Sequence, residues 1–144
     1  MKKLYFSYGM NTNLREMQQR CPDAVSLGAA ELPDYKIKFK HYATIALCEG
    51  STVQGVLWEI SPADEYSLDV LEGYPIIYGK IRVGVRHQNS IVEAMVYIML
   101  NSLAGRLYKT SQPSESYYRI VEQGYIDHGL NLSQLTQALL AVAD

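Results

Sequence analysis

One carboxylate in the chain occupies a position where acid–base chemistry could be done. Residues 67–78 read SLDVLEGYPIIY, and Glu72 stands where the amphipathic segment ends, just before Gly73. On a helix, Glu72 lies one turn after Leu68, so both side chains fall on the same, apolar side. Desolvation there raises the pKa of a carboxylate, and a general base working near neutral pH needs such a pKa. The alternative is a surface charge at a frayed helix end, which the local pattern alone favours.

The acids that precede Glu72 have a different pattern. Asp64, Glu65 and Asp69 look like ordinary surface charge, and Glu65 and Asp69 are displaced from the line that joins Leu68 to Glu72. We therefore expect these carboxylates to be solvated.

A second stretch with chemical potential is YFSYGMN, residues 5–11, where a predicted strand ends at Gly9 and a helix begins a few residues later. Gly9 allows the backbone to approach a ligand closely. The amides of this loop and of the following helix N-terminus could hold an anion such as a carboxylate. Taken alone the pattern is weak, because strand–glycine–loop–helix segments are common and usually form only a turn.

Other constellations that carry chemistry are missing from the sequence. His41, His87 and His128 occur singly and without metal-ligand spacing, and neither a nucleophile elbow nor a phosphate-binding loop is found. Cys21 and Cys48 do not form a C-x-x-C pair, so we expect two free buried thiols in a reducing cytoplasm. The sequence predicts neither a metal site nor a cofactor.

The composition is that of one globular domain covering residues 1–144. A net charge of -2 provides no basic surface for nucleic acid or an anionic membrane. No apolar run has the length of a signal peptide or a membrane span, so we expect a soluble, cytoplasmic protein. The 12 tyrosines would suit a polar pocket set into a packed core, although half-buried positions account for most of them.

The order of predicted elements indicates the fold class. Predicted strands cover Lys2–Tyr8, Asp34–Tyr42, Ala43–Leu47, Val53–Ile60, Tyr78–Arg86 and Ile91–Leu100. Predicted helices cover Asn13–Arg20, Ser61–Leu71, Pro113–Gln123 with a break near Gly124 or Gly129, and Asn131–Ala143. Because the strands come mostly in one block, we predict an α+β fold with a small mixed or antiparallel, barrel-like sheet flanked by helices.

Several segments become familiar when they are taken together. They are residues 5–11, 32–39, 53–60 and 68–75, Tyr78, and residues 113–117. In order and spacing this set resembles the γ-glutamyl cyclotransferase-like family over nearly the whole chain. Met10 departs from the family's usual Ser and removes a hydroxyl from the first motif. Asn11 resembles the general branch of the family rather than its glutathione-specific branch.

The resemblance implies a small β-barrel flanked by helices, no cofactor and Glu72 as the catalytic acid/base. It also implies a set of substrate-binding residues: Tyr5, Phe6, Ser7, Tyr8, Gly9, Met10, Asn11, Tyr78 and Tyr117. Some family members are dimers, and this sequence leaves open whether the chain is a monomer or a homodimer.

The reaction implied by the resemblance is an intramolecular one. The α-amine of a γ-glutamyl amide attacks the γ-carbonyl, 5-oxoproline forms and the amine leaves, so that one carboxylate can manage the proton transfers. Three interpretations remain: a cyclotransferase for γ-glutamyl amino acids, the same chemistry on a γ-glutamyl amine or a protected biosynthetic intermediate, and a non-catalytic module that binds a small ligand. The presence of Glu72 favours an enzyme, and Met10 keeps the binding module open.

Overall fold

The computed structural model describes residues 1–100 and 109–142. The strands are β1 (Lys3–Ser7), β2 (Val25–Lys40), β3 (Tyr42–Ile60), β4 (Tyr78–His87) and β5 (Ser90–Met99). The helices are the short 3₁₀ helix η1 (Met10–Thr12), α1 (Leu14–Arg20), α2 (Pro62–Glu72), α3 (Glu115–Asp127) and α4 (Ser133–Leu140).

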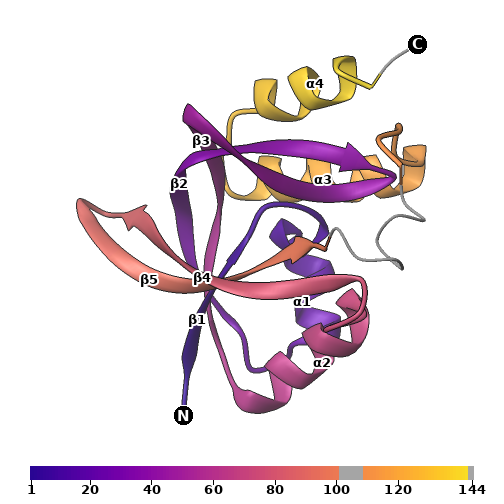
Figure 1. The fold of residues 1–144 in the computed structure, drawn as a ribbon. Coiled ribbons are helices and arrows are strands. Elements are labelled where there is room, and N and C mark those ends of the chain that lie inside the picture. Colours follow the sequence, from indigo (N-terminus) through magenta and orange to yellow (C-terminus); the bar gives the residue numbers. More distant parts are fainter. Residues whose placement is uncertain (101–108, 143–144) are drawn as a thin grey trace.

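The strands form a closed barrel in the order β1-β3-β2-β4-β5 (Figure 1). Neighbouring strands pair antiparallel, except that β1 and β5 pair in parallel and close the barrel. The main core takes buried side chains from every strand, including Phe6, Leu32, Val56, Val85 and Val96. The predicted α+β fold with a barrel-like sheet is confirmed.

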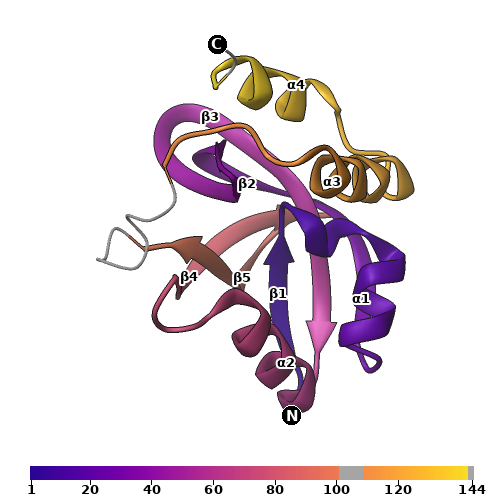
Figure 2. The same cartoon turned by 90° about the vertical axis from the view of Figure 1, so that its right-hand side faces the viewer.

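The helices lie at two ends of this barrel. Figures 1 and 2 show α3 and α4 beside the long β2–β3 hairpin, whereas α1 and α2 lie toward the N-terminal end of β1. The N-terminal end of α1 follows η1 directly, and α3 packs against η1. The short loop after β1 is therefore held between the barrel and a helix from the other end of the chain.

The hairpin of β2 and β3 is longer than the sequence prediction. The prediction for β2 began at Asp34, but the strand starts at Val25, and its register shifts between Ser26 and Gly28 and again between Pro33 and Tyr35. These bulges interrupt the alternation by which a strand is recognised in sequence. In β3, residues 48–51 lie between paired Leu47 and Thr52, so the two predicted strands are one irregular strand.

Helix α3 also differs from its prediction, because it continues through Gly124 and ends before His128. Gly124 is buried in the helix, where an added Cβ would overlap Thr12 Oγ1 and lie 2.5 Å from the Asn13 nitrogen. The residue serves a close helix contact rather than a break, and Gly129 with φ +67° follows the helix end.

The last predicted helix is shorter than expected, since α4 covers Ser133–Leu140. The predicted end of this helix, Ala143, lies outside the described residues. Both Cys21 and Cys48 are free; Cys21 is buried and Cys48 is half-buried. None of the helices in the described part of the chain is long and apolar enough to cross a membrane.

Candidate active site

Helix α2 carries Glu72 as its last residue. The helix begins with a capping box, in which the Ser61 side chain accepts from the Asp64 amide and the Asp64 carboxylate accepts from the Ser61 amide. It ends at Gly73, whose left-handed conformation (φ 64°) suits a residue without a side chain. The helix therefore persists through Glu72, and buried Leu68 lies one turn earlier on the same side.

The other acids of α2 are not the solvated charges that the sequence pattern predicted. Asp64 is buried, with 1% of its surface exposed, because its carboxylate caps the helix. Lys80 from β4 lies 2.8 Å from Glu65 Oε2 and 3.0 Å from Asp69 Oδ1. Tyr97 from β5 donates its hydroxyl to Asp69 Oδ1 at 2.5 Å. These partners come from distant strands, which a local helical pattern does not reveal, and they fasten α2 to the barrel.

The loop after β1 is compact. The backbone oxygen of Gly9 accepts from both the amide and the hydroxyl of Thr12, at 3.0 and 2.8 Å. An added Cβ on Gly9 would lie 3.1 Å from the Ala43 Cβ and 3.3 Å from the Tyr117 hydroxyl, so a side chain has little room here. The first amides of a helical turn lack partners inside the turn, and the Met10 backbone at the start of η1 hydrogen-bonds to the Tyr117 hydroxyl.

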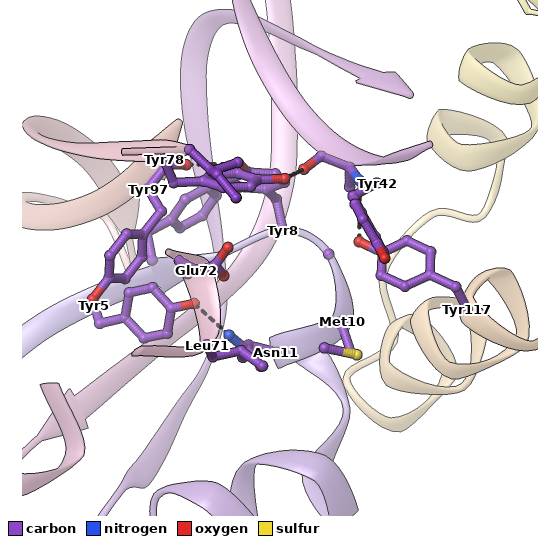
Figure 3. A pocket seen from close by; sticks show the side chains of 14 residues that line it. Tyr5, Tyr8, Met10, Asn11, Tyr42, Leu71, Glu72, Tyr78, Tyr97 and Tyr117 are labelled. Atoms are coloured by element: carbon purple, nitrogen blue, oxygen red, sulfur yellow. Dashed lines mark hydrogen bonds between the residues drawn. The ribbon is translucent and has the colours of Figure 1, made fainter. Parts of the chain in front are cut away.

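A cavity of about 330 Å³ lies between this loop and the end of α2 (Figure 3). Its lining includes these sequence-predicted residues: Tyr5, Phe6, Tyr8, Gly9, Met10, Asn11, Glu72, Tyr78 and Tyr117. Figure 3 shows Glu72 pointing into a space that Met10, Tyr42 and Tyr117 bound on the opposite side. The fold thus brings together residues from β1, α2, β4 and α3.

Ser7 is the one predicted site residue that does not line the cavity. Its hydroxyl donates to the Asn11 backbone oxygen at 2.9 Å and accepts from Trp58 Nε1, also at 2.9 Å. Ser7 alternates with Phe6 and Tyr8 along the strand and ties the loop to β3.

Sequence reasoning missed several lining residues: Tyr42, Ala43, Leu71, Ile77 and Tyr97. Leu71 and Ile77 lie close to Glu72 in the sequence, and this nearness is the signal that could have identified them as lining residues. Tyr42 and Tyr97 stood out only as members of a tyrosine-rich composition, because barrel closure decides which way their side chains point.

The tyrosine hydroxyls around the cavity are mostly engaged with backbone. Tyr78 donates to the Ala43 oxygen at 2.7 Å, and the Ala43 amide donates to the Tyr117 hydroxyl at 3.1 Å. Tyr8 donates to the Tyr97 backbone oxygen at 2.6 Å. Such bonds fix the positions of the rings and leave a rigid, largely aromatic wall.

Glu72 is the one charged side chain among the described residues that line the cavity. Burial raises its pKa from 4.5 to about 7, against a smaller opposing effect of the Arg20 charge. Burial, and then the Glu72 charge, raise the pKa of Tyr8, and the pKa of Tyr117 is raised chiefly by burial. At neutral pH, Glu72 can therefore both accept and donate a proton, while these phenols remain neutral.

Within residues 1–100 and 109–142, no group of three or more His, Cys, Asp or Glu side chains is placed to hold a metal ion. What the described cavity offers is a carboxylate of near-neutral pKa, neutral hydroxyls and the segment from Gly9 to Asn11.

The chain is similar to known proteins in sequence and in fold. A model of the family described as gamma-glutamyl cyclotransferase, AIG2-like, matches residues 5–122. The gamma-glutamylcyclotransferase of Mus musculus is 31% identical, over 88% of this chain and 72% of the mouse protein. That of Homo sapiens is also 31% identical, over 90% of this chain and 73% of the human protein. A solved structure of a gamma-glutamyl cyclotransferase matches with a TM-score of 0.83 and 28% identity, over 99% of this chain and 89% of that chain.

Proposed function

Because the chain belongs to the AIG2-like gamma-glutamyl cyclotransferase family and is thus a cyclotransferase-type enzyme, we propose that it releases 5-oxoproline from a γ-glutamyl amide, with Glu72 as general acid/base. The observation that carries this proposal is the Glu72 carboxylate, with a pKa of about 7, inside the cavity beside the Gly9 loop.

The reaction needs no nucleophile from the protein. The substrate's α-amine attacks its own γ-carbonyl carbon, so a new C–N bond closes the five-membered lactam while the original amide C–N bond breaks. Correct placement of two reacting groups can contribute roughly 7–11 kcal/mol to lowering the barrier. The tyrosine wall, whose hydroxyls are fixed on the backbone, supports this role because it would favour a folded conformation of the γ-glutamyl group.

Glu72 manages the proton balance. The α-amine is mostly protonated at neutral pH, so it must lose a proton before it attacks, and the departing amine must gain one. A carboxylate with a pKa of about 7 performs both transfers near neutral pH and ends the cycle unchanged. General acid–base catalysis of this kind is worth typically about a hundred- to ten-thousand-fold in rate.

The Gly9 loop would hold the substrate's α-carboxylate. Gly9 has no side chain to compete with an anion, and backbone amides at a helix start favour negative charge. Tyr78 and Tyr117, which are fixed on Ala43, would then border the γ-glutamyl group. Binding through the backbone also explains how the site can function with Met10 in place of the family's serine.

The test is release of 5-oxoproline from a panel of γ-glutamyl amides that includes γ-glutamyl amino acids and γ-glutamyl amines. The panel separates the two substrate classes by relative kcat/KM. Wild-type protein should act on at least one of them, with a pH profile of kcat/KM that rises with pH through an apparent pKa of about 7.

Glu72→Gln keeps the shape of the side chain but cannot accept a proton, so turnover should fall at least about a hundredfold. Glu49→Gln is the matched control, since Glu49 is exposed and lies outside the cavity. Asp69 would be a poor control, because it contacts Tyr97 and Lys80. A Glu72→Gln protein with wild-type turnover would end this mechanism.

A further inference from the structure

Arg20 is linked to the cavity without lining it. Its Nη1 donates to Asn11 Oδ1 at 2.7 Å, and Asn11 Nδ2 donates to the Tyr5 hydroxyl at 3.0 Å. Asn11 and Tyr5 both line the cavity, and Figure 3 shows their hydrogen bond beside Glu72. Two hydrogen bonds thus link the positive charge of Arg20, at the end of α1, to the cavity that contains Glu72.

The chemistry of the guanidinium group fixes the direction of this chain of hydrogen bonds. Arginine only donates, so the Asn11 side chain must turn its oxygen toward Arg20 and its nitrogen toward Tyr5. The oxygen of Tyr5 consequently accepts, and its own O–H is left to donate. Among the described residues, none accepts a hydrogen bond from that O–H, although Tyr5 is buried.

Arg20 is itself held in place. Its Nη2 lies 2.9 Å from Glu16 Oε1, one helical turn earlier on α1. The Glu16 amide in turn donates to the capping side chain of Asn13. The planar guanidinium therefore spans two fixed partners, a geometry that lysine cannot reproduce.

We propose that Arg20 is a positioning residue that acts through Asn11, and that it orients the Tyr5 hydroxyl as a hydrogen-bond donor to the γ-carbonyl oxygen of the substrate. This inference rests on the proposed cyclotransferase function. The γ-carbonyl oxygen gains negative charge when the α-amine attacks, and a fixed donor aimed at it lowers the barrier. No proton is transferred from Tyr5; its hydrogen bond shortens as the charge develops.

The proposed binding mode assigns the α-carboxylate to the Gly9 loop, which leaves the γ-carbonyl oxygen as the group for Tyr5 to contact. The attacking amine must meet Glu72, and the γ-carbonyl carbon bonds to that amine, so both reacting atoms lie near Glu72. Tyr5 is close enough to Glu72 that the Glu72 charge is, after burial, the second cause of the raised pKa of Tyr5. The same raised pKa keeps the Tyr5 hydroxyl protonated.

Arg20 has a second, separable effect, because its charge lowers the pKa of Glu72 relative to burial alone. The hydroxyls that share the cavity with Glu72 belong to Tyr5 and Tyr8 on β1, Tyr42 on β3, Tyr78 on β4, Tyr97 on β5 and Tyr117 on α3. Among the described residues, Arg20 supplies the charge that shifts the Glu72 pKa. Loss of Arg20 should thus move the pH profile as well as turnover.

The experiment is a double-mutant cycle on the full chain, measured as kcat at pH 9, where Glu72 is ionised. Tyr5→Phe should lose about a hundredfold, as removal of an oxyanion donor does. Arg20→Gln should lose roughly tenfold. The double variant should be no slower than Tyr5→Phe, because Arg20 acts through Tyr5. Arg15→Gln, an exposed arginine on the same helix, should behave like wild type.

The pH profile provides the readout that a merely structural role would not move. In Arg20→Gln, the apparent pKa of the rising limb should lie above that of wild type, whereas Arg20→Lys should restore the limb but not kcat. Carbon-13 NMR titration of the Glu72 carboxyl without substrate should likewise give a higher Glu72 pKa in Arg20→Gln than in wild type or Arg20→Lys. Thermal melts identify any variant that is simply unfolded, and Arg20→Lys then remains as the second probe.

Two results would overturn the inference alone: additive losses in the double variant, or Arg20→Gln indistinguishable from Arg15→Gln, in a wild type that turns over. A wild-type chain inert on every γ-glutamyl amide would remove the proposed function, and this inference with it.

Discussion

At the scale of single residues, Ala43 is the point where two cavity tyrosines meet the backbone. Its oxygen accepts from Tyr78, and its amide donates to Tyr117. A tyrosine that only touched substrate could be replaced by phenylalanine without loss of stability. Here the hydroxyl of Tyr117 also satisfies a buried amide, so binding and folding are coupled at one atom.

Tyr117→Phe should therefore destabilise the fold by about 1–3 kcal/mol, the usual effect of leaving a buried N–H without its partner. It should also lower kcat/KM, because the Ala43 segment and the cavity wall lose a fixed point. Urea unfolding and steady-state kinetics measure the two effects. Tyr66→Phe is the control, since 72% of Tyr66 is exposed. Unchanged stability would show that the Ala43 bond is not maintained in solution.

Met10 tests whether the backbone rather than a side chain holds the substrate. If the amides at the start of η1 provide the binding, Met10→Ser should leave turnover within about tenfold, or 1.4 kcal/mol. Met10→Ala separates the loss of bulk from the gain of a hydroxyl. The opposite result, an inert wild type that gains activity as Met10→Ser, would mean that the methionine side chain blocks the cavity.

The local helical pattern related Glu72 to Leu68 but by itself favoured a surface charge at a frayed helix end, and only the family resemblance implied a catalytic role for Glu72. The structure shows that the helix persists through Glu72 and that Leu68 is buried. The surroundings of the neighbouring acids could not be predicted from the sequence. Asp69 has the same local pattern as a solvated acid, yet it bonds to Tyr97. Such partners come from distant strands that become neighbours only when the barrel closes. A short stretch of sequence does not reveal which strands these are.

At the scale of elements, α3 acts on the cavity through the loop after β1. Gly124 of α3 lies against Thr12 and Asn13, and the hydroxyl of Thr12 donates to the Gly9 oxygen. The helix thus packs against the segment that lines the cavity. A side chain at Gly124 would have to displace backbone, which is harder to move than the end of a flexible side chain.

Gly124→Ala should consequently lower the free energy of unfolding by roughly 1–3 kcal/mol, toward the upper end of what overpacking costs. Turnover should fall as well, because the Gly9 loop moves with Thr12. Chemical denaturation measures the loss of stability, and kcat measures the loss of turnover. Gln123→Ala, exposed on the same helix, should change stability by no more than about 0.5 kcal/mol. If Gly124→Ala matched this control, the close packing of α3 on η1 would be refuted.

The strands show where sequence patterns stop being informative. Both strands of the β4–β5 hairpin were predictable to within one residue at each end. The turn between them has positive φ at Gln88 and Asn89, which suits such a tight hairpin. The first half of β2 was not predictable. Its bulges at Ser26 and Pro33 shift the pairing, so its apolar residues do not alternate regularly.

At the scale of the whole molecule, Glu72 makes folding depend on pH. Its pKa rises from 4.5 to about 7 on folding, so the folded chain keeps a proton that the unfolded chain has released between these values. Its contribution to stability is therefore fully present below about pH 4.5 and is lost as the pH rises to about 7. The site keeps its base at an energetic cost to the fold.

Glu72→Gln should accordingly be more stable than wild type above pH 7, by roughly 3 kcal/mol, and the difference should vanish toward pH 4.5. Urea unfolding at a series of pH values measures it. Taking the difference between the two proteins cancels acids such as Glu65, whose hydrogen bonds to Lys3 and Lys80 outweigh burial and lower its pKa. A difference independent of pH would place the Glu72 carboxylate in solvent.

The hydrogen bond between Trp58 and Ser7 has a consequence for the fluorescence of the protein. The chain has one tryptophan, and its Nε1 donates to the hydroxyl that itself donates to the Asn11 backbone. The indole is buried, so its emission should be blue-shifted and sensitive to small movements of the loop it anchors. Tyr5, which lines the cavity, is the strand partner of Trp58 and should transfer excitation energy to it. We therefore expect the fluorescence of Trp58 to change when a ligand fills the cavity, without any added label.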